Sequence, residues 1–346
     1  MKVSKKWLSS MLVIIMLTTF TVLAGCGNGE TSGSGGEQKT YKVIMTHELP
    51  ETFFKHKYME KFKEIVEEKS NGQLEVTIHS GGQLFKDGEA IQALGTGSVH
   101  MVWPVSAHLE ALNEEYGIVS LPFGLNDKKI MENPESRKEL TGLLDSFVED
   151  KGIKVLGLMR TAEGIILTGD KEVKELKDLS GLKVRTVSGQ VATDMAASLG
   201  ATGVSMPATE IATSLSQGVI DGVNTSPDGW KDVVGSTAKY GIVVPGMQVF
   251  TYSIAADKAW FEQLPEDLQK LMQDTLDELT IDQWKESIEL DKEYIDTVTN
   301  DWGKVHYVPE SDVAEWKKAT KEVHTKFEKR FPDALKKYNE ISDKYK

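Results

Sequence analysis

The sequence predicts an α/β fold in two lobes. Between residues 181 and 230, segments with strand and helix patterns alternate in the order strand, helix, strand, helix, strand. Alternation this tight favours adjacent parallel strands with helices packed against them. The chain has 346 residues, of which 40% are hydrophobic, and this is enough to bury a substantial core. We therefore expect two lobes that each hold a sheet.

The first strand of this region points to a binding site. Residues 181–186 alternate apolar and polar side chains, and Arg185 lies at the end of the predicted strand. Ligands of α/β folds bind beyond the carboxyl ends of the strands, and a guanidinium there can bind a carboxylate through two hydrogen bonds. The alternative is a solvated arginine or a structural partner of Glu210 or Asp221.

The rest of the region predicts further elements in order. They are a helix over 189–199 that Gly200 ends, an extended piece over 202–206, a helix that begins near Pro207, and a strand over 219–223.

Earlier and later segments continue the same pattern. We expect strands over 41–46, 73–79, 99–103, 152–159 and 250–256, and helices over 52–70, 87–94 and 127–151. Thr52 is the expected N-cap of the first helix. Pro265 opens a helix of about thirty residues with a continuous apolar stripe, and residues 311–346 predict a pair of amphipathic helices.

A set of short motifs is more specific than any one of its members. The set contains G-L-K-V-R ending at Arg185, M-P-x-x-E over 206–210 and L-x-x-G-V-I-D-G over 215–222. Earlier members are S-N-G at 70–72, G-Q-L at 82–84, E-A-I at 89–91 and L-P-F at 121–123. In order and spacing, this set resembles the substrate-binding proteins of TRAP transporters, the DctP family, over roughly residues 41–340.

The resemblance implies a fold, a division into lobes and a role for one arginine. The implied fold is two-lobed and periplasmic-binding-protein-like, with an interlobe cleft and a long helix that spans both lobes. We expect lobe I to comprise 41–162 and 251–290, and lobe II to comprise 163–250 and 291–346. In the family, the arginine that matches Arg185 binds the substrate carboxylate.

Ten residues are candidates for the wall of the cleft, from their places at predicted strand ends or from the resemblance. They are His47, Trp103, Ser106, Arg160, Arg185, Met206, Glu210, Thr225, Ser226 and Trp230. For Trp103 and Trp230, packing in the core is an equal alternative, because buried aromatic side chains usually serve the core.

The chain departs from the family pattern at three positions. Ile166 stands where many relatives carry a second arginine, Ala208 where many carry an aromatic residue, and Thr225 where many carry asparagine. Either Arg160 replaces the missing arginine from a neighbouring position, or the ligand needs a single cation. These departures argue against a sugar acid or a C4-dicarboxylate as the ligand.

The N-terminus predicts an exported lipoprotein. Three lysines precede an apolar run over 7–23, and the run ends in Leu-Ala-Gly before Cys26, which is the single cysteine of the chain. This is the pattern of a signal peptide over 1–25 with a lipid-modified Cys26. Residues 26–40 then form a Gly- and Ser-rich tether. We expect the protein on the outer face of the cytoplasmic membrane, anchored by lipid.

Composition and motifs exclude several other classes of protein. The net charge is −13, and it becomes more negative when the lysine-bearing signal is removed, which argues against nucleic acid as a partner. Neither His47 nor His108 lies in a spacing typical of a metal site, and we expect no cofactor.

Three functions remain for such a chain. The favoured one is a solute-binding protein that captures a small organic acid and presents it to the small and large membrane permease subunits of a TRAP transporter. A sensor module for a receptor kinase needs the same cleft. An extracytoplasmic hydrolase is disfavoured, because the sequence has no G-x-S-x-G motif and its cysteine is expected to be lipidated. We therefore expect no enzymatic activity.

Overall fold

The computed structural model describes residues 39–125 and 133–345. The expected signal peptide, Cys26 and nearly all of the tether lie outside these residues. The start of the helix expected over 127–151 also lies outside them.

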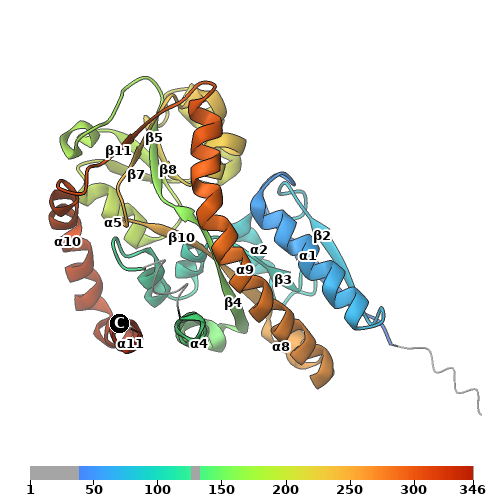
Figure 1. Ribbon diagram of the computed structural model, residues 1–346. Helices are drawn as coiled ribbons and strands as arrows, with labels where there is room; N and C mark the ends of the chain where they lie inside the picture. The colour runs from blue at the N-terminus through green and yellow to red at the C-terminus, as the bar shows by residue number, and fades with distance from the viewer. Residues whose placement is uncertain (1–38, 126–132, 346) are drawn as a thin grey trace, which may run out of the picture. The chain divides into compact units, whose positions relative to one another are not determined.

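The strands of the described residues form two sheets (Figure 1). In the first sheet, β1 is parallel to β2 and β3, and β10 is antiparallel to β3 and β4. Its strands, in spatial order, are β2 (Leu74–His79), β1 (Tyr41–Thr46), β3 (Met101–Val102), β10 (Val249–Asp257) and β4 (Ile153–Glu163). The expected strand–helix–strand unit at the start of the chain is present.

The second sheet contains the region that predicted the fold. Strand β6 lies between β8 and β7 and is parallel to both, as the alternation of segments predicts. Its strands, in spatial order, are β11 (Lys304–Tyr307), β9 (Tyr240–Val243), β5 (Ile165–Thr168), β8 (Gly222–Thr225), β6 (Lys183–Thr186) and β7 (Thr202–Ser205). The strand expected over 219–223 begins later, at Gly222, because Gly218 adopts a left-handed turn and leaves Val219 51% exposed.

Helices cover both sheets. They are α1 (Phe54–Lys69), α2 (Asp87–Ala93), α4 (Pro134–Val148), α5 (Gln190–Ser198), α6 (Ile211–Ser216), α7 (Pro227–Gly229), α8 (Lys258–Glu262), α9 (Glu266–Thr299), α10 (Val313–Arg330) and α11 (Pro332–Lys344). The expectation for the start of α1 was wrong. Phe53, not Thr52, occupies the N-cap, and no side chain caps this end. Burial of Phe53 and Phe54 fixes the start of the helix instead.

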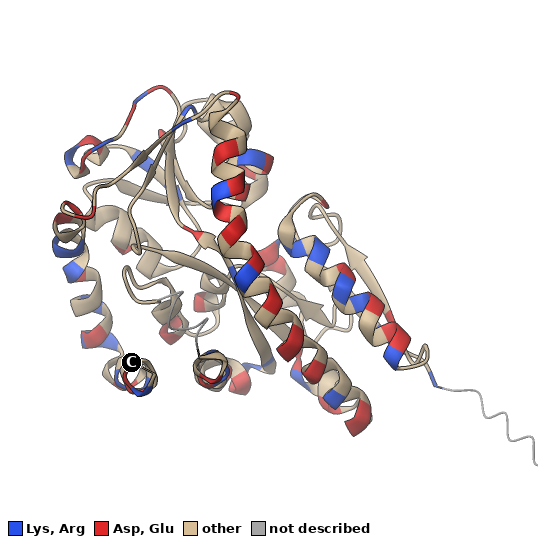
Figure 2. Ribbon diagram, viewed as in Figure 1, with Lys and Arg blue, Asp and Glu red and all other residues tan. Residues whose placement is uncertain are grey.

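The long helix α9 connects the two sheets. It has 34 residues and packs on β4 and α1 toward its start and on α7 and β11 toward its end (Figure 1). Its buried stripe includes Leu268, Met272, Leu276 and Trp284. Figure 2 shows charged residues along α1 and α9, whereas the strands carry few. The expected helix that spans both lobes is therefore present.

A buried ion pair fastens α9 to β4. Strand β4 continues beyond its expected end at Met159, so Arg160 lies inside the strand. The Arg160 guanidinium donates to Asp291 Oδ2 at 2.6 Å and to the Ser287 carbonyl at 3.2 Å, while its backbone N–H donates to Gln283 Oε1 at 2.9 Å. These hydrogen bonds attach Arg160 to the long helix.

The C-terminal helix pair is present as predicted. Helix α10 packs on α5, and α11 packs on α4. Since α4 falls in the range expected for lobe I and α11 in that expected for lobe II, the C-terminal end of the chain also joins the two halves. The exact lobe boundaries stay a prediction. Within the described residues, no helix has the length and apolar character that membrane crossing requires.

The ion pair gives a stability prediction. Asp291→Ala leaves the buried Arg160 guanidinium without its carboxylate and should lower the free energy of unfolding by about 3 kcal/mol, measured by urea denaturation. Asp274→Ala is the control, because it removes an exposed ion pair with Lys270 on the same helix and should change little. Equal stability of the two variants would contradict a structural role for this pair.

Candidate functional site

A cavity of about 50 Å³ lies between the two sheets. Residues of both sheets and of the segments that follow their strands line it, as expected for a ligand site of an α/β fold. Its polar lining residues are Glu48, Asp87, His108, Thr161, Arg185, Thr225 and Ser226. Its apolar lining includes Leu49, Phe53, Val105, Val187, Ile211, Val233, Phe250 and Tyr252.

Arg185 is buried in the wall of this cavity without a counter-ion. The side chain is 3% exposed, and in the described part of the chain no carboxylate lies within 4.0 Å of it. Its Nε and Nη2 donate to the Met206 carbonyl at 3.0 and 2.9 Å, and Nη1 donates to the Asn224 carbonyl at 3.3 Å. Burial lowers the pKa of Arg185 to about 10, so it remains charged at neutral pH.

The Met206 and Asn224 backbone carbonyls orient the Arg185 side chain. Because β6 lies between β7 and β8, the residues at the carboxyl ends of both neighbours reach the guanidinium. Three of its five N–H groups donate to these carbonyls. The other two have no acceptor among the described residues and are available to a carboxylate ligand.

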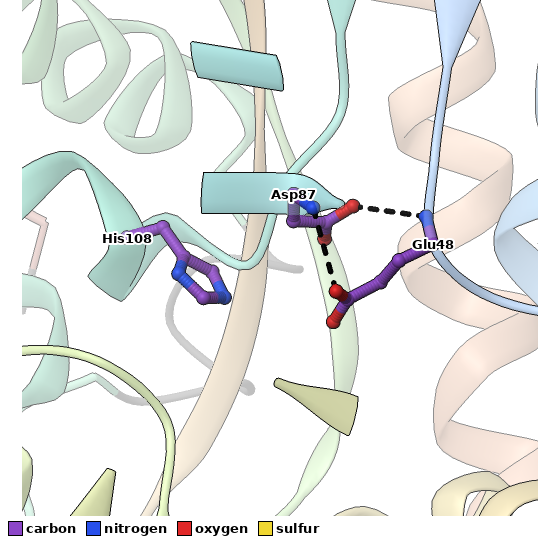
Figure 3. A group of neighbouring side chains, drawn as sticks. All are labelled: Glu48, Asp87 and His108. Carbon is purple, nitrogen blue, oxygen red and sulfur yellow. Dashed lines mark hydrogen bonds between the residues drawn. The ribbon is translucent and has the colours of Figure 1, made fainter. Parts of the chain in front are cut away.

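An acidic pair lies on the side of the cavity formed by the first sheet. Glu48 follows β1, and Asp87 begins α2 (Figure 3). The Glu48 backbone donates to Asp87 Oδ1 at 3.2 Å, and the Asp87 backbone donates to Glu48 Oε2 at 3.4 Å. Lys55, which is 1% exposed, pairs with Asp87 Oδ2 at 3.4 Å.

The two carboxyl groups have pKa values shifted in opposite directions. Burial and the neighbouring Asp87 raise the pKa of Glu48 above its ordinary value. For Asp87, burial also acts to raise the pKa, but the Lys55 ammonium, His108 and the Glu48 backbone N–H together outweigh it and hold the pKa below the ordinary value. Asp87 and Lys55 therefore form a neutral pair.

His108 lies beside the acidic pair (Figure 3). The imidazole is 7% exposed, and burial lowers its pKa, so the ring is neutral at pH 7. One atom each of Glu48, Asp87 and His108 lies within 4.8 Å of the others, a spacing from which a metal ion can be held. However, Lys55 already balances Asp87, and backbone N–H groups occupy oxygens of both carboxylates. With the Lys55 ammonium already paired to one of the carboxylates, this donor set fits a divalent cation poorly.

The turn after β8 supplies hydroxyl groups to the cavity. Thr225 ends the strand, and Ser226 caps α7 by accepting the Gly229 N–H at 3.3 Å. A Cβ at Gly229 would lie 2.4 Å from Thr225 Oγ1, so glycine is needed for this close approach. Ser226 Oγ donates to the buried Asp228 carboxylate, which accepts the Gly229 N–H as well.

Several residues expected at the cleft lie elsewhere. Trp103 is 1% exposed and packs edge-on against Phe62, and Trp230 is fully buried with its Nε1 donating to the Ala238 carbonyl at 3.0 Å. Neither ring lines the cavity. Ser106 exchanges hydrogen bonds with neighbours on β10 and also lies outside the lining.

Four further candidates differ in their placement. His47 is fully buried 3.0 Å from a nitrogen of His56, and burial lowers its pKa to about 3. Glu210 is exposed and pairs with Lys86 at 2.9 Å. Met206 contributes its backbone carbonyl to Arg185, and Arg160 is paired with Asp291. None of the four lines the cavity, whereas Arg185, Thr225 and Ser226 do.

The sequence did not identify Glu48, Asp87 and Tyr252 as residues of the cavity wall. His108 was considered only as a metal ligand and was rejected because its spacing fits no metal motif. Glu48 had a signal, since it follows His47 at the end of a predicted strand. Asp87 marked the start of a predicted helix, where an acidic residue is common for reasons of helix stability. Lys55, whose pairing distinguishes Asp87 from Glu48, carries no local signal.

A two-lobed α/β fold with a small cavity between its sheets, lined by a buried arginine, is the architecture of a solute-binding protein. The chain belongs to the family described as bacterial extracellular solute-binding protein, family 7 (DctP), whose model matches residues 45–330.

Known proteins extend this finding. The C4-dicarboxylate-binding protein DctB of Bacillus subtilis is 24% identical over 300 residues, which are 86% of this chain and 85% of that protein. The structure of a sugar-acid-binding protein of Advenella mimigardefordensis, solved with galactonate, matches this chain with a TM-score of 0.83 and 21% identity. The match covers 89% of this chain and 99% of that protein. A Bordetella pertussis solute receptor that binds pyroglutamic acid has a TM-score of 0.78 with 23% identity, covering 87% and 100%.

The buried Asp228 gives a pH prediction. Burial raises its pKa to about 7, so the carboxyl is protonated in the folded protein while the unfolded chain has already lost the proton. This group therefore lowers stability as pH rises from about 4 to about 7. Asp228→Asn should gain stability relative to the wild type over that window, by about 2–4 kcal/mol.

Denaturant unfolding at several pH values tests this prediction. Asp301→Asn, at an exposed position, provides the comparison. A stability difference between Asp228→Asn and wild type that stays constant or shrinks as pH rises would show that Asp228 is ionised in the folded protein.

Proposed function

We propose that this protein binds a small organic acid in the cavity between its sheets, with the ligand carboxylate on Arg185. The observation that carries this proposal is the buried guanidinium without a carboxylate partner among the described residues. Burying an unpaired charge is costly, and an anion in the cavity offsets this cost. A carboxylate matches the two free N–H groups through charge-assisted hydrogen bonds.

The known proteins support the same class of ligand. The similar proteins described above bind C4-dicarboxylate, galactonate and pyroglutamic acid, and each of these molecules carries a carboxylate. Their other groups differ widely, which supports the carboxylate as the shared chemistry and leaves the remaining contacts to each protein's own cavity.

A single guanidinium serves this cavity. Ile166, at the position of the family's second arginine, is 3% exposed in β5, and Arg160 is paired with Asp291. No other arginine is among the described lining residues. This arrangement supports a ligand with one carboxylate held by arginine rather than a dicarboxylate clamped by two.

Contacts across the cavity suggest how the ligand is enclosed. The Ala208 backbone, beyond β7, donates to Glu48 Oε1 at 3.2 Å, and Lys86 pairs with Glu210 at 2.9 Å. Both contacts join segments of the first sheet to segments of the second. Closure around a ligand would form them and would strengthen the carboxylate contact by excluding water.

The partners follow from the family and the N-terminal sequence. We infer that the loaded protein delivers its ligand to TRAP-type permease subunits in the membrane. A lipid on Cys26 would hold it at the outer face of that membrane, as the lipobox suggests. The family is one of extracellular solute-binding proteins, which supports a role in transport rather than catalysis.

Replacement of Arg185 tests this function. Arg185→Met keeps an apolar stem but removes the guanidinium, so affinity for organic acids that bind the wild type should fall at least about 100-fold. Candidate acids are first found by thermal shift, because a ligand of the native state raises the melting temperature, and affinities are then measured by calorimetry.

The matched control is Arg137→Met. Arg137 is also buried, but it lies over the Trp284 ring and does not line the cavity. This variant should bind as the wild type does. Unchanged affinity in folded Arg185→Met would place the carboxylate elsewhere and would contradict the proposal.

A further inference from the structure

Two buried ionisable groups of opposite type, one acidic and one basic, face the cavity, and neither forms an ion pair with another described residue. Glu48 is 5% exposed and Arg185 is 3% exposed, and both line the same space. In the residues that the structure describes, no cation lies within 4.0 Å of the Glu48 carboxylate and no carboxylate lies that close to Arg185. The two groups come from opposite sides of the cavity.

The partners of Glu48 are all neutral. Its Oε1 accepts the Ala208 N–H and its Oε2 accepts the Asp87 N–H, so one acceptor site on each oxygen remains. Asp87 differs from it, because the Lys55 ammonium supplies its counter-charge. Lys55 also donates to the Trp103 carbonyl at 2.9 Å and lies over the Tyr252 ring, and it makes no ion pair with Glu48.

Arg185 and Glu48 do not form an ion pair, although the charge of Glu48 acts on the guanidinium and raises its pKa. The Met206 and Asn224 carbonyls hold the guanidinium, while the Ala208 and Asp87 backbones hold the carboxylate. Both ends are thus fixed with a gap between them. A molecule that fills this gap and carries a positive nitrogen near Glu48 and a carboxylate near Arg185 would satisfy both charges at once.

We propose that the ligand is a small zwitterion, whose carboxylate binds Arg185 and whose protonated amine donates to Glu48. This inference rests on the proposed function, because it assigns the carboxylate to the same arginine. It adds a second polar contact that defines the class of ligand as an amino acid or a cyclic imino acid. The neutral Lys55–Asp87 pair and the neutral His108 leave the charge balance of the site to these two groups.

The remaining lining residues indicate what the non-ionic part of the ligand should be. Leu49, Phe53, Val187, Val233 and Phe250 present apolar surface to the cavity. A short aliphatic chain or a five-membered ring fits this lining better than a hydroxylated sugar, whose hydroxyl groups would lose their hydrogen bonds to water. The volume of about 50 Å³ also favours a small molecule.

Isosteric pairs of molecules isolate the contribution of the amine. L-Proline and cyclopentanecarboxylate differ only by an NH₂⁺ in place of a ring CH₂, and L-alanine and isobutyrate differ only by NH₃⁺ in place of a methyl group. Calorimetry at pH 7 should give at least about tenfold tighter binding for the amino member of a pair, because its amine makes a charge-assisted hydrogen bond.

Replacement of Glu48 identifies the group responsible. Glu48→Gln keeps the side-chain size but removes the charge, and it should abolish the preference for the amino member while leaving binding of the plain carboxylate equal or stronger. Glu89→Gln is the control, since Glu89 is an exposed carboxylate of α2 outside the cavity lining, and it should retain the preference.

Each other outcome overturns the inference. Equal or tighter binding of the plain carboxylates would show that Glu48 is protonated in the complex and that the ligand is an anion. Failure of both amino members to bind would exclude a small zwitterion. In either case, loss of carboxylate binding in Arg185→Met would still support the proposed function, whereas absence of binding by every organic acid tested would contradict that function itself.

Discussion

The burial of Arg185 constrains how the ends of β6, β7 and β8 are arranged at the cavity. The Arg185 guanidinium is 3% exposed, and among the described residues its hydrogen-bond acceptors are backbone carbonyls. It has therefore lost its hydration without forming an ion pair. Its site can be maintained because two parallel neighbours of β6 bring carbonyl groups to one point. The second sheet thus presents a buried cation to the cavity, and this arrangement supports the proposed binding of an anion.

The first sheet and α9 position the residues on the other side of the cavity, opposite Arg185. Glu48 and Asp87 lie at the end of β1 and the start of α2. Helix α9 fixes the position of β4, whose Thr161 also lines the cavity, through Arg160 and Asp291. Rigid supports on both sides allow the closing contact between Glu48 and the Ala208 N–H to be specific. A ligand that satisfies both halves would favour the closed arrangement by the difference in its affinity for the two states.

Much of the fold follows from local sequence patterns, because strands and helices alternate with clear hydrophobic periods. Arg185 was predictable for the same reason, as it stands at a strand end. Arg160 was harder to place, because the apolar run ends at Met159 whereas β4 continues to Glu163. Trp103 and Trp230 could equally serve a core or a cleft by sequence, and the environment of Glu48 depends on Lys55 and Ala208, which are brought together only by tertiary packing.

A crystal structure of the protein with its tightest-binding organic acid would show which residue holds the carboxylate. The ligand carboxylate is expected at about 2.7–2.9 Å from Arg185 nitrogens, with the lobes closed over it. A ligand seated in another cavity, or one in this cavity whose carboxylate contacts a different cation, would contradict the role assigned to Arg185.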